Sequence, residues 1–193
     1  MGERRARCLR GEDGMTLVEV LIAALLMAVG VIAMISVFDS SRGLVTTSEK
    51  NDVVAHEGEA EMERLLARDY RSIALTTAPS HSSSSTDPDY YVQPDGTYQW
   101  DQSTSPRPAD PVVVDGTHGA VAHISTWNDG QSRLSGSIYR YVTWIDDPNI
   151  AGTQDTKRVT VVVTVNNTDT GAAAGQLKKP VLLSSVVIDP AAQ

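Results

Sequence analysis

The first feature of the hydrophobic pattern is one long apolar run. Residues 15–38 read MTLVEVLIAALLMAVGVIAMISVF, in which 13 of 24 residues are Leu, Ile, Val or Phe and Glu19 carries the only charge. A helix needs about 20 residues to cross the core of a bilayer. The apolar residues of the run contribute roughly −4 to −8 kcal/mol of insertion free energy, whereas one central carboxylate costs about 2.5–3.5 kcal/mol. The run therefore predicts a membrane-spanning helix in spite of Glu19.

The helical spacing continues beyond this run, through residues 39–77, but polar residues now separate the apolar ones. No proline occurs before Pro79, so nothing in the sequence forces a break. We therefore expect one nearly continuous helix from Met15 to about Ile73, apolar all round in its first half and amphipathic in its second. A bend is expected near Gly43, which has serine and threonine neighbours. The apolar positions of the second half are Val45, Val53, Val54, Met62, Leu65, Leu66, Tyr70 and Ile73.

The rest of the chain, from residue 78 onward, predicts a small β-rich head. Residues 78–111 are rich in serine and proline and are expected to form an irregular, flexible loop, with one short strand at Tyr98 and Trp100. From residue 112 the hydrophobic period becomes two, which is typical of strands. The resulting fold class is α+β, a long N-terminal helix packed on a small antiparallel C-terminal sheet, with the valine face of residues 159–165 on the amphipathic half of the helix. The expected strands are Val112–Val114, Val121–Trp127, Ile138–Ile145, Val159–Val165 and Val181–Ile188.

The residues at the start of the apolar run carry a motif. Gly14-Met15-Thr16-Leu17-Val18-Glu19 resembles the processing site of type IV prepilins. The resemblance implies that a membrane peptidase removes residues 1–14 as a leader, by cutting between Gly14 and Met15, and that the new amino group of Met15 is methylated. It also implies that Glu19 is the acid required for assembly and that the fold is pilin-like. The chain departs from the family at Ser36, where many pilins have proline, and at Met15, where phenylalanine is usual.

Elementary electrostatics gives a reason for this spacing. Met15 and Glu19 are four residues apart, so they share one helix face. After cleavage the amine of Met15 is a cation in or near lipid, where an unpaired charge is costly. The carboxylate of Glu19 can neutralise that amine within one chain or between neighbouring subunits. A contact between subunits would set the axial register of a helix bundle.

The distribution of arginine predicts the orientation in the membrane. Four arginines precede the apolar run, namely Arg4, Arg5, Arg7 and Arg10. An excess of positive charge marks the cytoplasmic side of a span. We therefore expect a single-pass membrane protein with a cytoplasmic N-terminus and an extracytoplasmic head, located at the cell surface once it has assembled into a filament.

The remaining composition excludes several kinds of chemistry. The net charge of −8 argues against a nucleic-acid surface, which needs clustered Lys and Arg. Cys8 is the only cysteine and lies in the leader, so the processed chain has no thiol chemistry. The sequence has no G-x-S-x-G motif and no glycine-rich phosphate loop, so we expect a substrate of an enzyme rather than an enzyme. No cofactor is expected, except that Asp146, Asp147 and Asp155 leave a calcium site open, with turn formation as the alternative.

These observations predict a minor subunit of a type IV pilus-like filament. Its expected partners are the prepilin peptidase and methylase, other pilin-like subunits through the N-terminal helix, and an inner-membrane assembly platform. A pseudopilin of type II secretion is the alternative within the class, and a non-polymerising, membrane-anchored binding module is the alternative from another class. A DNA-uptake pilin would need a basic patch, for which the candidates are Arg133, Arg140, Lys157, Arg158, Lys178 and Lys179.

Overall fold

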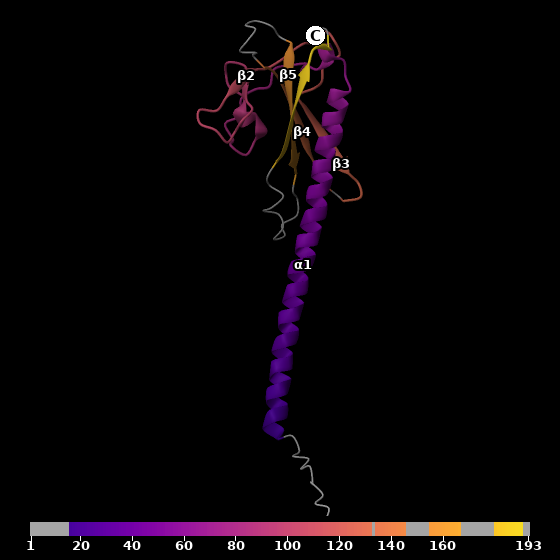
Figure 1. Cartoon of the computed structure of the whole chain (residues 1–193), viewed down its shortest axis with the longest axis vertical. Coiled ribbons are helices and arrows are strands. Elements are labelled where there is room, and N and C mark those ends of the chain that lie inside the picture. The colour runs from indigo at the N-terminus through magenta and orange to yellow at the C-terminus, as the bar shows by residue number, and fades with distance from the viewer. Residues whose placement is uncertain (1–15, 133, 146–154, 167–179, 191–193) are drawn as a thin grey trace, which may run out of the picture. The chain divides into compact units, whose positions relative to one another are not determined.

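The computed structural model describes residues 16–132, 134–145, 155–166 and 180–190. The chain divides into two compact units between Val45 and Thr46, and each unit is described by itself. The fold is α+β, as expected: one long N-terminal helix, a four-stranded antiparallel sheet and a small two-stranded sheet (Figure 1).

Helix α1 runs from Leu17 to Leu66. The helix continues without interruption through Gly30, Ser36 and Gly43. Its C-terminal end lies seven residues before the predicted limit at Ile73. Residues 70–72 form instead the short 3₁₀ turn η1 (Tyr70–Ser72).

Backbone pairing with distant residues explains why the helix ends early. The N–H of Leu75 donates to the carbonyl oxygen of Val113 at 3.0 Å, and that of Thr76 donates to the carbonyl oxygen of Val121 at 2.9 Å. Ile73 and Leu75 are fully buried. These non-local contacts require an extended backbone, so tertiary packing overrides the weak preference of residues 67–73 for a helix.

The main sheet has the strand order β3-β4-β5-β6, with every neighbouring pair antiparallel. The expected meander of the last three strands is confirmed, and the strand expected at Val121–Trp127 is present as β3, which begins at Ile124 and ends at Asp129. Val112–Val114 is not a strand, because it forms only isolated bridges to Leu75 and Thr143. The strands are β3 (Ile124–Asp129), β4 (Leu134–Trp144), β5 (Thr156–Val165) and β6 (Val181–Ile188).

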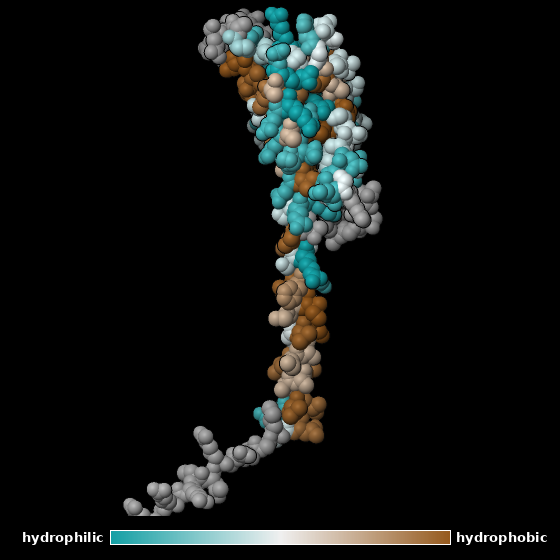
Figure 2. All heavy atoms as spheres, turned by 90° about the vertical axis from the view of Figure 1, so that its right-hand side faces the viewer, coloured by the Kyte–Doolittle hydropathy of each residue, from teal (hydrophilic) through white to brown (hydrophobic). Residues whose placement is uncertain are grey.

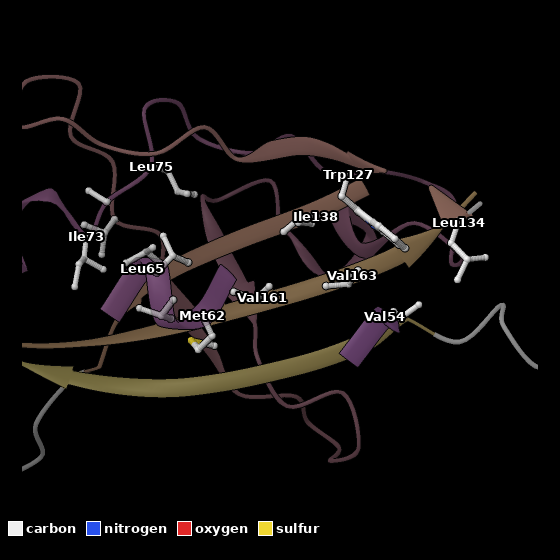
Figure 3. Close-up of a cluster of buried hydrophobic side chains, with 14 residues drawn as sticks. Val54, Met62, Leu65, Ile73, Leu75, Trp127, Leu134, Ile138, Val161 and Val163 are labelled. Atoms are coloured by element: carbon white, nitrogen blue, oxygen red, sulfur yellow. The ribbon is translucent and has the colours of Figure 1, made fainter. Parts of the chain in front are cut away.

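The core of the head lies between this sheet and the last turns of α1. Val54, Met62 and Leu65 of the helix belong to one buried cluster with Val161 and Val163 of β5 (Figure 3). The prediction that the valine face of β5 lies on the amphipathic part of the helix is therefore confirmed. At Gly58 an added Cβ would lie 3.0 Å from Leu183 Cδ1, so the absence of a side chain allows helix and sheet to approach closely.

Part of the other face of the sheet is covered by the segment that was expected to be a loop. This segment contains the 3₁₀ turn η2 (Pro88–Tyr91) and the paired strands β1 (Thr97–Gln99) and β2 (Ala109–Pro111). Tyr98 stacks on Tyr141 of β4 with ring centroids 3.9 Å apart. Val92 and Val162 complete this second buried cluster. Residues 78–111 are thus largely irregular, with a short strand at Tyr98 as expected, and burial of this tyrosine packs the segment on the sheet, which its composition did not indicate.

Candidate functional site

Of the predicted processing and assembly site, which consists of Gly14, Met15 and Glu19, the structure describes only Glu19, in the first turn of α1. The N–H of Glu19 donates to Thr16 Oγ1 at 3.3 Å and to the carbonyl oxygen of Thr16 at 3.0 Å. Thr16 therefore caps the helix, and Glu19 stands three residues later, which is the T-x-x-E spacing of a capping box. Gly14 and Met15 lie outside the described residues, so the cleavage site and the Met15–Glu19 pairing remain predictions.

The apolar part of α1 presents its side chains outward on every side. All residues from Thr16 to Val45 are exposed, among them Leu17, Met27 and Phe38. Figure 2 shows apolar side chains as brown spheres over this stretch. By length and composition this helix is able to cross a membrane. The hydroxyl of Ser36 donates to the carbonyl oxygen of Ile32 at 3.2 Å, so the serine has an acceptor within the helix itself.

A buried ion pair joins the last turns of α1 to the sheet. Arg140 Nε of β4 lies 2.7 Å from Glu61 Oε1, and both side chains are about nine-tenths buried, with 9% of each exposed. The two terminal nitrogens of Arg140 donate to the carbonyl oxygen of Ala122 at 3.0 Å and to Ser125 Oγ at 2.7 Å. Glu61 Oε2 also accepts from Arg64 at 3.4 Å, so the pair is satisfied on both sides, which is the condition for keeping charges inside a protein.

A second polar cluster fastens η2 to the sheet. His123 Nδ1 lies 2.8 Å from the carbonyl oxygen of Arg140, and its Nε2 lies 2.8 Å from Asp89 Oδ1. The carbonyl oxygen and the carboxylate are both acceptors, so each ring nitrogen of His123 faces a hydrogen-bond acceptor. The hydroxyl of Tyr141 donates to the same carboxylate oxygen at 2.7 Å. Burial, and then the Asp89 carboxylate, raise the pKa of Tyr141.

Two cations of β5, Lys157 and Arg158, are held by contacts within the head. Lys157 Nζ donates to the carbonyl oxygens of Tyr70 and Ile73 at 2.8 and 2.9 Å. It also lies 4.3 Å from the ring centroid of Tyr70 and 4.9 Å from that of Trp144. Burial lowers the pKa of this amine. Arg158 is paired with Asp110 and lies over the ring of Trp100.

This arrangement bears on the basic patch that DNA binding would need. Of its six candidates, Arg140, Lys157 and Arg158 are the three that the structure describes. Only 7% of Arg140 and 3% of Lys157 is exposed, and Arg158 has its own carboxylate partner. These three cations therefore serve the fold and do not form a phosphate-binding surface. Arg133, Lys178 and Lys179 lie outside the described residues.

Several acidic residues of the loops form turns. Asp115 Oδ1 accepts from the N–H and the hydroxyl of Thr117 at 2.8 and 2.6 Å. These bonds, with one from His118, hold the pKa of the Asp115 carboxyl well below its usual range. Asp95 and Asp101 make the same bonds to Thr97 and Ser103.

The calcium hypothesis falls mainly on residues that the structure does not describe. Asp146 and Asp147 lie outside the described residues, and Asp155 accepts from the hydroxyl of Thr156 at 3.4 Å. Within the described ranges, no three His, Cys, Asp or Glu side chains come together in a way that could hold a metal ion.

Sequence reasoning did not foresee the Glu61–Arg140 and Asp89–His123–Tyr141 clusters. A signal for the first was present in the periodicity. Arg140 occupies the same face of β4 as Ile138 and Val142, and Glu61 adjoins Met62 and Leu65 on the buried side of the helix. When two apolar faces each carry one charge, of opposite sign, packing the faces against each other lets the two charges pair.

Comparisons with known proteins do not identify a family. Scans of protein-family models, of curated proteins and of solved structures return no match to this chain.

Proposed function

We propose that this protein is a prepilin-like subunit of a type IV pilus-like filament, of the minor-pilin kind. In this proposal a peptidase cuts between Gly14 and Met15, and Met15 is N-methylated. The mature helix then anchors the head outside the membrane until it packs with the helices of other subunits. The observation that carries the proposal is the G-M-T-L-V-E motif at the start of an apolar helix whose side chains are exposed on every side.

The position of Glu19 supports this function more than it supports a simple anchor. An acid in the first turn is favoured by the helix dipole and by the capping box, effects that are worth about 1 kcal/mol in sum. A carboxylate inside the bilayer costs about 2.5–3.5 kcal/mol at the centre and less near the interface. Capping alone therefore gives a weak reason for a charge in residues 17–38, whereas a cationic amine on a neighbouring subunit gives a strong one.

The leader and the head fit the same proposal. The four arginines before the apolar run favour a cytoplasmic N-terminus. Within the head, the buried pair of Glu61 and Arg140 joins the last turns of α1 to the sheet. In this function the chain is a substrate of the peptidase and a structural element, not a catalyst.

Replacing Glu19 with glutamine tests the proposal. Glutamine keeps the size of the side chain and an amide oxygen as acceptor, and loses the charge. In cells with an active prepilin peptidase, we expect the Glu19→Gln protein to be cut and to stay in the membrane, but to be absent from filaments sheared off the cell surface. Glu49→Gln, at an exposed position of the same helix, is the matched control and should be found in the sheared fraction. Equal recovery of wild type and Glu19→Gln in that fraction, or no wild type there at all, would contradict the proposal and favour an anchored, non-polymerising module.

A further inference from the structure

Among the residues that the structure describes, strand β6 is an edge of the main sheet and has no strand paired on its outer side. It is the last strand in the order β3-β4-β5-β6, and its eight residues pair with β5 in an unbroken register from Ile188 to Val181. Its sequence, VLLSSVVI, contains no charged residue, and the register has no bulge. Soluble proteins normally protect such an edge with charges, proline, bulges or a short strand. The opposite edge, β3, is shorter and more polar, with Asp129 at its end.

Apolar surface borders this edge on both sides. On the side of α1, a hollow of about 260 Å³ is lined by Glu59, Met62, Glu63, Leu183 and Ser184. On the opposite face of the sheet, the second layer leaves part of β6 uncovered: Leu182 is 40% exposed, Val186 53% and Ile188 55%. In Figure 3, β6 is the yellow strand at the margin of the sheet, beside the labelled helix residue Met62. An added strand would find apolar contacts for both of its faces.

The charges around the hollow indicate which segment could occupy it. Glu59 and Glu63 stand one helical turn apart on its rim and are exposed. Among the described residues no cation forms an ion pair with either of them. An occupant that carries Lys or Arg would neutralise both. A second copy of this chain fits less well, because its own net charge is −8 and its other free edge, β3, contains neither Lys nor Arg.

We propose that the free edge of β6 binds an extended segment of a partner protein, in which apolar side chains alternate and a Lys or Arg faces Glu59 and Glu63. Main-chain hydrogen bonds to β6 would hold the segment, and the two apolar borders would select its side chains. This inference concerns the head alone and goes beyond the proposed function, because it holds whether or not the N-terminal helix polymerises.

The test uses the full chain in detergent micelles and a synthetic peptide. The peptide is about as long as β6, roughly eight residues, alternates valine with threonine and carries lysine at both ends. Peptide binding is measured by fluorescence anisotropy, and its place by hydrogen exchange of the fragment that covers residues 181–188. A peptide of the same length and charge, in which one central residue is replaced by proline, cannot complete the ladder and is the control ligand.

Three variants make the result specific. Val186→Lys places a charge on the exposed border of β6 and should weaken binding about tenfold or more. Ile124→Lys is the matched control on β3, where Ile124 is 44% exposed on the same face of the sheet, and should leave the affinity unchanged. Glu59→Lys with Glu63→Lys should weaken binding of the lysine peptide and restore it for a peptide with glutamate in place of lysine.

The proposal predicts that the lysine peptide slows hydrogen exchange in β6 and that the proline peptide does not. It also predicts that the variant with Glu59→Lys and Glu63→Lys prefers the glutamate peptide to the lysine peptide. It is overturned if the peptide does not protect β6, if it protects β3 equally, or if Val186→Lys binds like wild type. Protection of β6 that rises with protein concentration alone, without peptide, would assign the edge to a second copy instead. Loss of filament assembly in the Glu19 experiment would not affect any of these outcomes, so the two proposals fail separately.

Discussion

The buried pair between Glu61 and Arg140 gives the sharpest prediction about the head. Arg140 keeps hydrogen bonds to Ala122 and Ser125 when Glu61 is changed to glutamine, but its charge loses the only carboxylate bonded to it within the described residues. Removing one partner of a buried pair costs about 3–5 kcal/mol, because the other charge stays buried. Whole domains are stable by only about 5–15 kcal/mol. Glu61→Gln should therefore remove a large part of the stability of the head.

Urea denaturation of the full chain in micelles measures this loss. Tryptophan emission is a specific signal, because the three tryptophans of the chain, Trp100, Trp127 and Trp144, all lie in the head. With a slope of roughly 2 kcal/mol per M, the midpoint should fall by about 2 M. Glu59→Gln, which changes an exposed glutamate two residues earlier, should alter the stability by no more than about 0.5 kcal/mol.

A double variant separates charge from shape. Glu61→Leu combined with Arg140→Met leaves no buried charge, so it should recover most of the stability lost in the single variant. A loss below about 1 kcal/mol in Glu61→Gln would refute the claim that a buried charge is left unpaired. Equal instability of the double and single variants would show that packing, and not charge, explains the loss.

Two further predictions concern the sheet. Gly136→Ala should destabilise the head by about 3 kcal/mol or more, because an added Cβ would lie 1.8 Å from the carbonyl oxygen of Thr164 and 2.6 Å from Trp127 Nε1; a urea midpoint close to that of wild type would contradict this geometry. Burial raises the pKa of Tyr141, so its contribution to stability is complete below about pH 10 and is lost as the pH rises further, when the unfolded chain releases the proton first. Denaturation followed at increasing alkaline pH should show this decline, and Tyr141→Phe should make it shallower; an unchanged slope would refute the assignment.

Period and composition predicted the elements of this protein better than their ends. The alternation of valine in residues 159–165 was sufficient to predict β5 and its buried face, because a strand with one apolar face has to pack that face against the core. The end of α1 was not predictable in this way. It depends on hydrogen bonds from Leu75 and Thr76 to residues about 40 positions later, and no local pattern records such contacts.

The same limit applies to the second layer and to the polar clusters. Residues 78–111 have the composition of a loop, and they become ordered because Tyr98 stacks on a tyrosine from a distant strand. His123 has no recognisable motif, and its partner Asp89 precedes it by 34 residues. At the N-terminus the situation is reversed, because a local motif predicts a processing site on Gly14 and Met15, outside the described residues.

Cleavage between Gly14 and Met15 is the central claim of this account, and the intact mass and N-terminal sequence of the protein from native membranes test it most directly. The wild-type protein should begin at an N-methylated Met15, whereas Gly14→Asp, which puts a charged side chain at the cleavage site, should keep its leader and its full mass. Glu49→Gln is the control variant and should be processed like wild type. A wild-type chain that still begins at residue 1, unmethylated, in cells with an active prepilin peptidase would contradict the account.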